Sequence, residues 1–152
     1  MNGALMEKVA IVTGAGRGIG RGIAEELAAN GAKIIVNDSG VTLSGEAGSI
    51  GLADEVATDI KTAGGDAVSI TESVSTFTGG QRIVQAALDS FGQLDIVVTA
   101  AGILRDRMIY NMTEEEWDAI YDVHLKGTFN VIRHAAPLFR QQRGGRIITF
   151  TS

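Results

Sequence analysis

The sequence has 152 residues, of which 45% are hydrophobic and 20% charged, a composition that excludes a disordered chain and allows one domain with a buried core. Its formal net charge of −5, with no run of basic residues, argues against a nucleic-acid-binding surface. It contains no cysteine and no apolar run near the roughly 20 residues that span a membrane. We therefore expect a cytoplasmic, soluble protein that binds neither nucleic acid nor membrane and holds no metal.

Strand and helix patterns alternate along the whole chain. Short apolar runs without polar alternation predict buried strands, and apolar residues spaced four apart predict the helices between them. The predicted strands cover residues 9–13, 33–37, 67–70, 94–99 and 146–151, and the predicted helices cover 18–30, 52–63, 80–91 and 114–139. This order predicts an α/β fold of the Rossmann type, with three αβα layers, a five-stranded parallel sheet and one domain over residues 1–152.

A glycine-rich turn joins the first predicted strand to the first helix. It fits the pattern T-G-x-x-x-G-x-G at Thr13, Gly14, Gly18 and Gly20, whereas a literal G-x-G-x-x-G does not fit. Glycines let the backbone turn tightly and approach a ligand, and the N–H groups at the start of the following helix suit a phosphate. The turn predicts a nucleotide-phosphate site, with a ligand-free turn as the alternative.

Asp38 ends the second predicted strand, 18 residues after Gly20. A carboxylate at this place can accept hydrogen bonds from both hydroxyls of an adenosine ribose and would repel a 2′-phosphate. The alternative is an Asx turn leading into Ser39 and Gly40. Together with the glycine turn, the spacing favours the ribose role.

These motifs, with the segment 94–102 and the strand region 144–152, resemble the short-chain dehydrogenase/reductase family in their order and spacing. The resemblance covers essentially the whole chain. Residues 37–40, 101–107 and 123–125 are most similar to one branch of the family. That branch holds the (3R)-hydroxyacyl-CoA dehydrogenase unit of peroxisomal multifunctional enzymes and its bacterial relatives.

The resemblance implies that NAD or NADP binds at the C-terminal ends of the strands. It implies that the pyrophosphate is bound by Gly14, Gly18, Ile19 and Gly20, and the adenosine ribose by Asp38. It also implies that Ser73 and Val74 flank the adenine and that Ala100, Ala101 and Gly102 line the nicotinamide-side ribose. Arg17 is a further predicted cofactor contact, and it lies where members that use NADP often carry a basic residue. Because an uncompensated carboxylate facing a phosphate is costly, Asp38 outweighs Arg17, and we expect NAD rather than NADP.

The chain departs from the family pattern at three places. The family's Asn-Asn-Ala-Gly is Thr-Ala-Ala-Gly at residues 99–102. His124 stands where the family usually has a catalytic asparagine, so it either bonds a carbonyl or holds a proton-relay water. Ser152 corresponds to the catalytic serine and is the last residue, while no Tyr-x-x-x-Lys occurs in the sequence. We expect a truncated sequence that binds cofactor but is nearly inert alone.

The predicted function is an oxidoreductase that transfers a hydride between a nicotinamide and a secondary alcohol or ketone, with a 3-hydroxyacyl thioester as the candidate substrate. A non-catalytic nucleotide-binding fragment and an NADPH-dependent 3-oxoacyl-carrier-protein reductase are the alternatives. By analogy with the family, the helix from Trp117 to Phe139 contributes to a homo-oligomer interface when the protein is complete. Its apolar row could equally be the stripe that faces the sheet.

Overall fold

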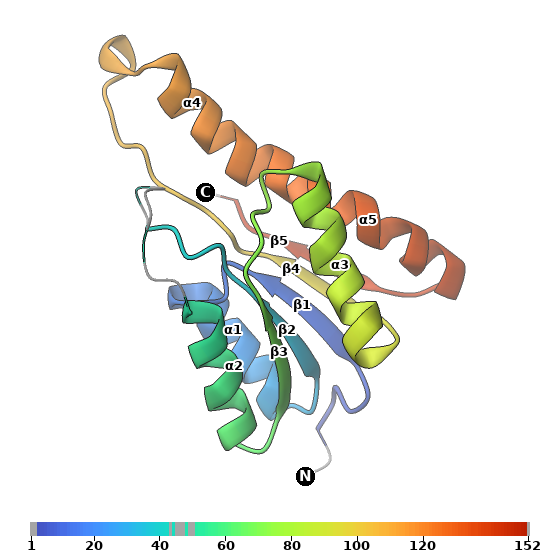
Figure 1. The fold of residues 1–152 in the computed structure, drawn as a ribbon. Helices are drawn as coiled ribbons and strands as arrows, with labels where there is room; N and C mark the ends of the chain where they lie inside the picture. Colours follow the sequence, from blue (N-terminus) through green and yellow to red (C-terminus); the bar gives the residue numbers. More distant parts are fainter. Residues whose placement is uncertain (1–2, 43, 45–47, 49–50, 152) are drawn as a thin grey trace.

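The computed structural model describes residues 3–42, 44, 48 and 51–151, in which strands alternate with helices (Figure 1). In chain order the elements are β1 (Val9–Thr13), α1 (Gly18–Ala29), β2 (Lys33–Asn37), α2 (Leu52–Thr62), β3 (Asp66–Ile70), α3 (Phe77–Phe91), β4 (Ile96–Thr99), η1 (Ile109–Asn111), α4 (Glu114–Ile120), η2 (Tyr121–Lys126), α5 (Gly127–Gln142) and β5 (Arg146–Thr149). The element η1 is a short 3₁₀ helix and η2 is a π-helix.

The five described strands form one parallel sheet in the order β3-β2-β1-β4-β5. Thr13 at the end of β1 lies beside Asn37 of β2 and Thr99 of β4, so these three strands end at the same level. The chain moves outward from β1 in one direction to reach β3 and in the other to reach β4 and β5. Ligands of parallel α/β sheets bind where the strand order reverses in this way.

The core lies on both faces of the sheet. Alternate residues of β1 point to opposite faces, because Ala10 and Val12 belong to one buried cluster and Val9 and Ile11 to another. Residues of α1 and α2 complete the first cluster, and residues of α3 and α5 complete the second. Figure 1 shows these helix pairs on opposite sides of the sheet. The predicted three-layer αβα arrangement with five parallel strands is confirmed.

Several predicted boundaries are wrong. Helix α3 begins at Phe77 rather than at residue 80, because the Thr76 hydroxyl accepts a hydrogen bond from the Gly79 N–H at 3.0 Å and caps it. The long helix predicted over 114–139 contains the π-helical segment η2 and continues to Gln142. Strand β4 begins two residues later than predicted, and β5 ends two residues earlier.

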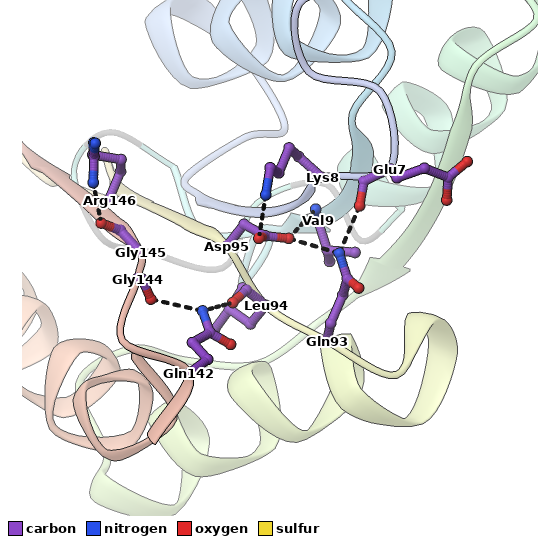
Figure 2. A network of polar contacts seen from close by, with 10 residues as sticks. All are labelled: Glu7, Lys8, Val9, Gln93, Leu94, Asp95, Gln142, Gly144, Gly145 and Arg146. Carbon is purple, nitrogen blue, oxygen red and sulfur yellow. Dashed lines mark hydrogen bonds and ion pairs between the residues drawn. The ribbon is translucent and has the colours of Figure 1, made fainter. Parts of the chain in front are cut away.

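Asp95 ties strands together at the N-terminal end of the sheet, opposite the glycine turn (Figure 2). Its carboxylate accepts hydrogen bonds from the Val9 N–H at 3.0 Å and from the Gln93 amide at 2.8 Å, and it pairs with Lys8 at 3.0 Å. Partial burial raises the pKa of Asp95, but the bonds from Val9, Lys8 and Gln93 together outweigh burial and lower it. Nearby, the Gln142 amide donates to the carbonyls of Leu94 and Gly144. These bonds join α5 to the segments that lead into β4 and β5.

Candidate functional site

A cavity of about 720 Å³ opens at the C-terminal ends of the strands. Its volume lies within the roughly 300–1,000 Å³ that small-molecule and cofactor sites occupy. All eleven residues that the sequence predicts as cofactor contacts line this cavity, namely Gly14, Arg17, Gly18, Ile19, Gly20, Asp38, Ser73, Val74, Ala100, Ala101 and Gly102. The fold thus brings together residues from the turns after four different strands.

The glycine turn packs so closely that side chains are excluded at Gly14 and Gly20. Gly14 has φ +64°, and a Cβ there would lie 2.6 Å from the Cα of Ala101. A Cβ on Gly20 would lie 2.2 Å from the carbonyl oxygen of Gly14. Glycine at these positions lets the turns after β1 and β4 approach each other and lets α1 start directly against the turn.

Gly18 differs, because the space beside it is open. It has φ +55°, it lines the cavity, and a Cβ there would meet no protein atom within 4 Å. Helix α1 begins at this residue, has no side-chain cap at Arg17 and carries no acidic residue in its first turn. The positive end of α1 is therefore not neutralised by its own side chains and can receive an anion from the cavity.

Asp38 is 8% exposed and lies at the cavity wall. One carboxylate oxygen accepts a hydrogen bond from the Gly16 N–H at 3.0 Å, and the other accepts one from the Gly40 N–H at 2.8 Å. The second bond is the Asx turn that the sequence left as an alternative. Since each carboxylate oxygen has two acceptor positions, the turn leaves room for bonds from ligand hydroxyls.

Arg17 lines the cavity, but its guanidinium is used by the protein itself. Its Nη2 donates to the carbonyl oxygen of Val41 in the segment after β2. The side chain thus joins the glycine turn to the segment that carries Asp38. This contact occupies one side of the guanidinium fork that a 2′-phosphate would otherwise receive.

Two buried amides hold the segment at the end of β3. The Asn130 side chain, 1% exposed on α5, donates to the Val74 carbonyl at 2.8 Å. Helix α3 can lie this close to α5 because Gly80 has no side chain, and a Cβ there would lie 2.7 Å from the backbone of Asn130. The Asn37 amide donates to the carbonyls of Ile70 and Glu72. These bonds fix the cavity wall at Ser73 and Val74.

The turn after β4, which lacks the family's two asparagines, is linked to the neighbouring strand. The Ala101 N–H donates to the Thr13 hydroxyl at 3.3 Å, which links this turn to β1. The Thr99 hydroxyl is the one buried side-chain oxygen or nitrogen without a hydrogen-bond partner among the described residues. This hydroxyl stands at the position of the first asparagine in the family pattern.

His124 lies on η2 and contacts the backbone just beyond this turn. Its Nε2 is 3.1 Å from the Ile103 nitrogen and 2.8 Å from the Ile103 carbonyl oxygen. One ring nitrogen can accept from the N–H or donate to the carbonyl, but it cannot do both in one protonation state. His124 is not among the residues that line the cavity. The predicted catalytic residue Ser152 lies outside the described residues.

The cavity also has walls that sequence motifs did not predict. Some lining residues flank predicted ones, such as Asn37 and Ser39 on either side of Asp38. Their position next to Asp38 was the sequence feature that could have predicted them. Others, including Ala119 and Asp122, come from α4 and η2 and have no motif of their own. No cluster of three or more potential metal ligands occurs within the described ranges. Nor does any helix in them have the length and apolarity needed to cross a bilayer.

Comparison with known proteins gives a consistent assignment. The family model described as short chain dehydrogenase matches residues 8–152. Peroxisomal multifunctional enzyme A of Dictyostelium discoideum is 47% identical over 96% of this chain and 32% of its own length. A short chain dehydrogenase from Mycobacterium avium, solved by crystallography, is 46% identical with a TM-score of 0.89, covering 99% of this chain and 54% of that one.

A third similar protein has a cofactor named with it. The structure of a 7α-hydroxysteroid dehydrogenase complexed with NADH and 7-oxo glycochenodeoxycholic acid is 28% identical, with a TM-score of 0.87 over 97% of this chain and 54% of that one. The chain thus spans about half the length of these solved relatives, and less of the multifunctional enzyme.

Proposed function

Because this chain belongs to the short-chain dehydrogenase family, we propose that it forms the dinucleotide-binding part of an NAD-dependent oxidoreductase. The observation that carries the proposal is the convergence of all eleven predicted contact residues on one cavity. The open space at Gly18 and the uncapped start of α1 fit a diphosphate there. Ser73 and Val74 would flank the adenine, and Ala100 to Gly102 would line the nicotinamide-side ribose.

NAD is proposed over NADP because of the hydrogen bonds that the two charged residues near the ribose position already make within the protein. Asp38 is fixed by two backbone N–H groups, so it cannot easily turn away from a 2′-phosphate. Arg17, the residue that would favour NADP, is engaged with the Val41 carbonyl. Both observations favour a ribose with free hydroxyls. The NADH named with the hydroxysteroid dehydrogenase agrees with this choice for a relative of 28% identity.

The proposed reaction interconverts a secondary alcohol and a ketone. When bound, NAD supplies a hydride acceptor at the nicotinamide. In this chain Ser152 would donate a hydrogen bond to the substrate oxygen, and His124 would hold the turn after β4 or a proton-relay water. The sequence contains no Tyr-x-x-x-Lys, so we expect these 152 residues alone to bind cofactor without turning over substrate.

We also propose a cytoplasmic protein that forms homo-oligomers when complete. Its proposed substrate class is a 3-hydroxyacyl or 3-oxoacyl thioester. The support is similarity to a peroxisomal multifunctional enzyme and the resemblance of residues 101–107 and 123–125 to that branch. The test is an assay of the full product of the gene with NAD and a series of 3-hydroxyacyl thioesters and simple secondary alcohols. Turnover of alcohols alone would remove the thioester assignment and leave the oxidoreductase assignment standing.

A further inference from the structure

Five charged side chains line the cavity, and four of them are engaged within the protein. Arg17 donates to a carbonyl and Asp38 accepts from two N–H groups. Glu72 pairs with Arg82 at 3.1 Å, and Asp122 pairs with Lys126 at 3.0 Å. The fifth is Arg105, which makes no hydrogen bond or ion pair with any residue of the described part of the chain.

Arg105 is partly buried, which makes its lack of partners notable. Its neighbour Arg107 is more exposed and yet forms an ion pair with Glu116 at 2.8 Å. The pKa of Glu116 is lowered, first by the backbone bond from the Thr113 N–H and then by Arg107 and Arg105. Arg105 acts on this carboxylate only through its charge at longer range. A guanidinium has five N–H donors, and withdrawing them from water without new bonds costs free energy. A ligand that satisfies them would gain that energy.

The backbone next to Arg105 is fixed. Ile103 is 4% exposed, lines the cavity, and has both its N–H and its carbonyl within hydrogen-bond distance of His124. Arg105 follows two residues later and borders a second hollow of about 450 Å³ as well as the main cavity. The guanidinium is therefore carried by an anchored segment at the junction of the two hollows.

The charges of the cavity favour a particular kind of ligand for Arg105. The lining contains three carboxylates and two arginines, and one of those arginines is already bonded. A phosphate entering this cavity needs a positive side chain besides the end of α1, and Arg105 is the charged lining residue with no bonded partner among the described residues. Guanidinium groups bind phosphate oxygens through two parallel hydrogen bonds.

We propose that Arg105 is a phosphate-binding residue of this cavity. The inference rests on the proposed function, because that function brings two kinds of phosphate to the site. One is the diphosphate of the cofactor, and the other is the phosphate of a phosphopantetheine thioester entering through the second hollow. Arg105 determines affinity for whichever of these it contacts, and the two sources predict different results in one experiment.

The experiment compares the wild-type full gene product with Arg105→Gln and Arg105→Lys. It measures the NADH dissociation constant by fluorescence and the KM for two thioesters, acetoacetyl-CoA and acetoacetyl-N-acetylcysteamine, of which the second has no phosphate. We expect Arg105→Gln to weaken one phosphate-bearing ligand about tenfold or more, since bonds to charged groups are the strong ones. A weaker NADH identifies the cofactor, and a higher KM for the CoA thioester alone identifies the substrate. Arg105→Lys, which keeps the charge, recovers part of the loss.

Arg140→Gln is the matched control, because that arginine is exposed on α5 and lines neither hollow; it is expected to change neither ligand. The proposal for Arg105 would be overturned if Arg105→Gln left the NADH affinity unchanged and either left the KM of both thioesters unchanged or changed both by the same factor. If the wild-type protein turns over neither thioester, the substrate class in the proposed function fails. The NADH measurement then still decides on Arg105, and an unchanged value would overturn it.

Discussion

Gly18 lies in the cavity wall with open space beside it, so under the proposed function a side chain there would meet the ligand rather than protein. Its φ of +55° disfavours other residues, and the space beside it is open. We predict that Gly18→Ala costs about 1–2 kcal/mol of folding free energy. We also predict at least about tenfold weaker NADH binding, equal to roughly 1.4 kcal/mol, because the methyl group would occupy the place of the diphosphate. Denaturant unfolding and NADH titration measure the two effects.

Gly22, one turn along α1, is the control for this substitution. A Cβ there also meets no atom within 4 Å, but its φ is not in the left-handed region and it does not line the cavity. Gly22→Ala should therefore stabilise α1 by up to about 1 kcal/mol and leave NADH affinity unchanged. If Gly18→Ala binds NADH as tightly as Gly22→Ala does, the diphosphate does not lie at this turn.

Asp95 makes a pH-dependent contribution to stability at the opposite end of the sheet. Its pKa is lowered in the folded protein, because the bonds from Val9, Lys8 and Gln93 together outweigh the effect of burial. The contribution is therefore full above the unfolded-state pKa of about 3.9 and is lost as the pH falls through the lower folded-state value. We predict that Asp95→Asn destabilises the protein at pH 7 by about 1–3 kcal/mol. Denaturant unfolding measures this, and the gap to wild type should shrink below about pH 4.

Asp118→Asn is a suitable control for this measurement. Asp118 is an exposed carboxylate on α4, and its replacement should change stability by less than about 0.5 kcal/mol at either pH. A gap between wild type and Asp95→Asn that stays constant from pH 7 to strongly acidic conditions would show that the Asp95 contribution is packing and not charge.

At the scale of elements, the π-helical segment η2 connects the long helix to the turn after β4 through His124. This contact fits the first of the two roles considered for His124, bonding to a backbone carbonyl. We predict that His124→Ala weakens NADH binding about three- to tenfold, since a hydrogen bond of about 1 kcal/mol that fixes the cavity wall is lost. His124→Asn should recover most of this, because an amide can accept from the Ile103 N–H and donate to its carbonyl.

The comparison of kcat with NADH affinity in the full gene product separates the two roles of His124. A loss of kcat with unchanged NADH affinity in His124→Ala would favour the proton-relay role over positioning. Leu125→Ala, which alters an exposed neighbour on η2, controls for disturbance of the segment itself and is expected to leave NADH affinity unchanged.

At the scale of the whole molecule, the layers and strand order follow from features that one sequence contains. The unbroken apolar run of β1 predicts burial on both faces, and alternation of strands and helices predicts parallel pairing. Helix boundaries were less predictable, because the Thr76 cap precedes two glycines that suggested a later start. The π-helical segment was not predicted, since the apolar spacing of residues 117–139 does not distinguish a π-helical stretch from an α-helix.

The site divides in the same way. Residues in the glycine turn and Asp38 were predictable because their chemistry is local to the turns that carry them. The hydrogen bond from Arg17 to the Val41 carbonyl depends on distances between segments, which sequence spacing does not give. The same holds for Arg105, whose guanidinium has no bonded partner among the described residues. The sequence therefore predicted where the candidate site lies. The bonding of Arg17 and Arg105, which bears on cofactor preference and on phosphate binding, could be described only from the structure.

Cofactor preference tests the central claim most directly, namely that this cavity holds NAD with its ribose at Asp38. The measurement is titration of the full gene product, wild type and Asp38→Ala, with NADH and with NADPH. The account predicts that the wild type binds NADH at least about tenfold more tightly than NADPH, a difference of roughly 1.4 kcal/mol, and that Asp38→Ala removes most of that preference. Tighter binding of NADPH than of NADH by the wild-type protein would contradict it.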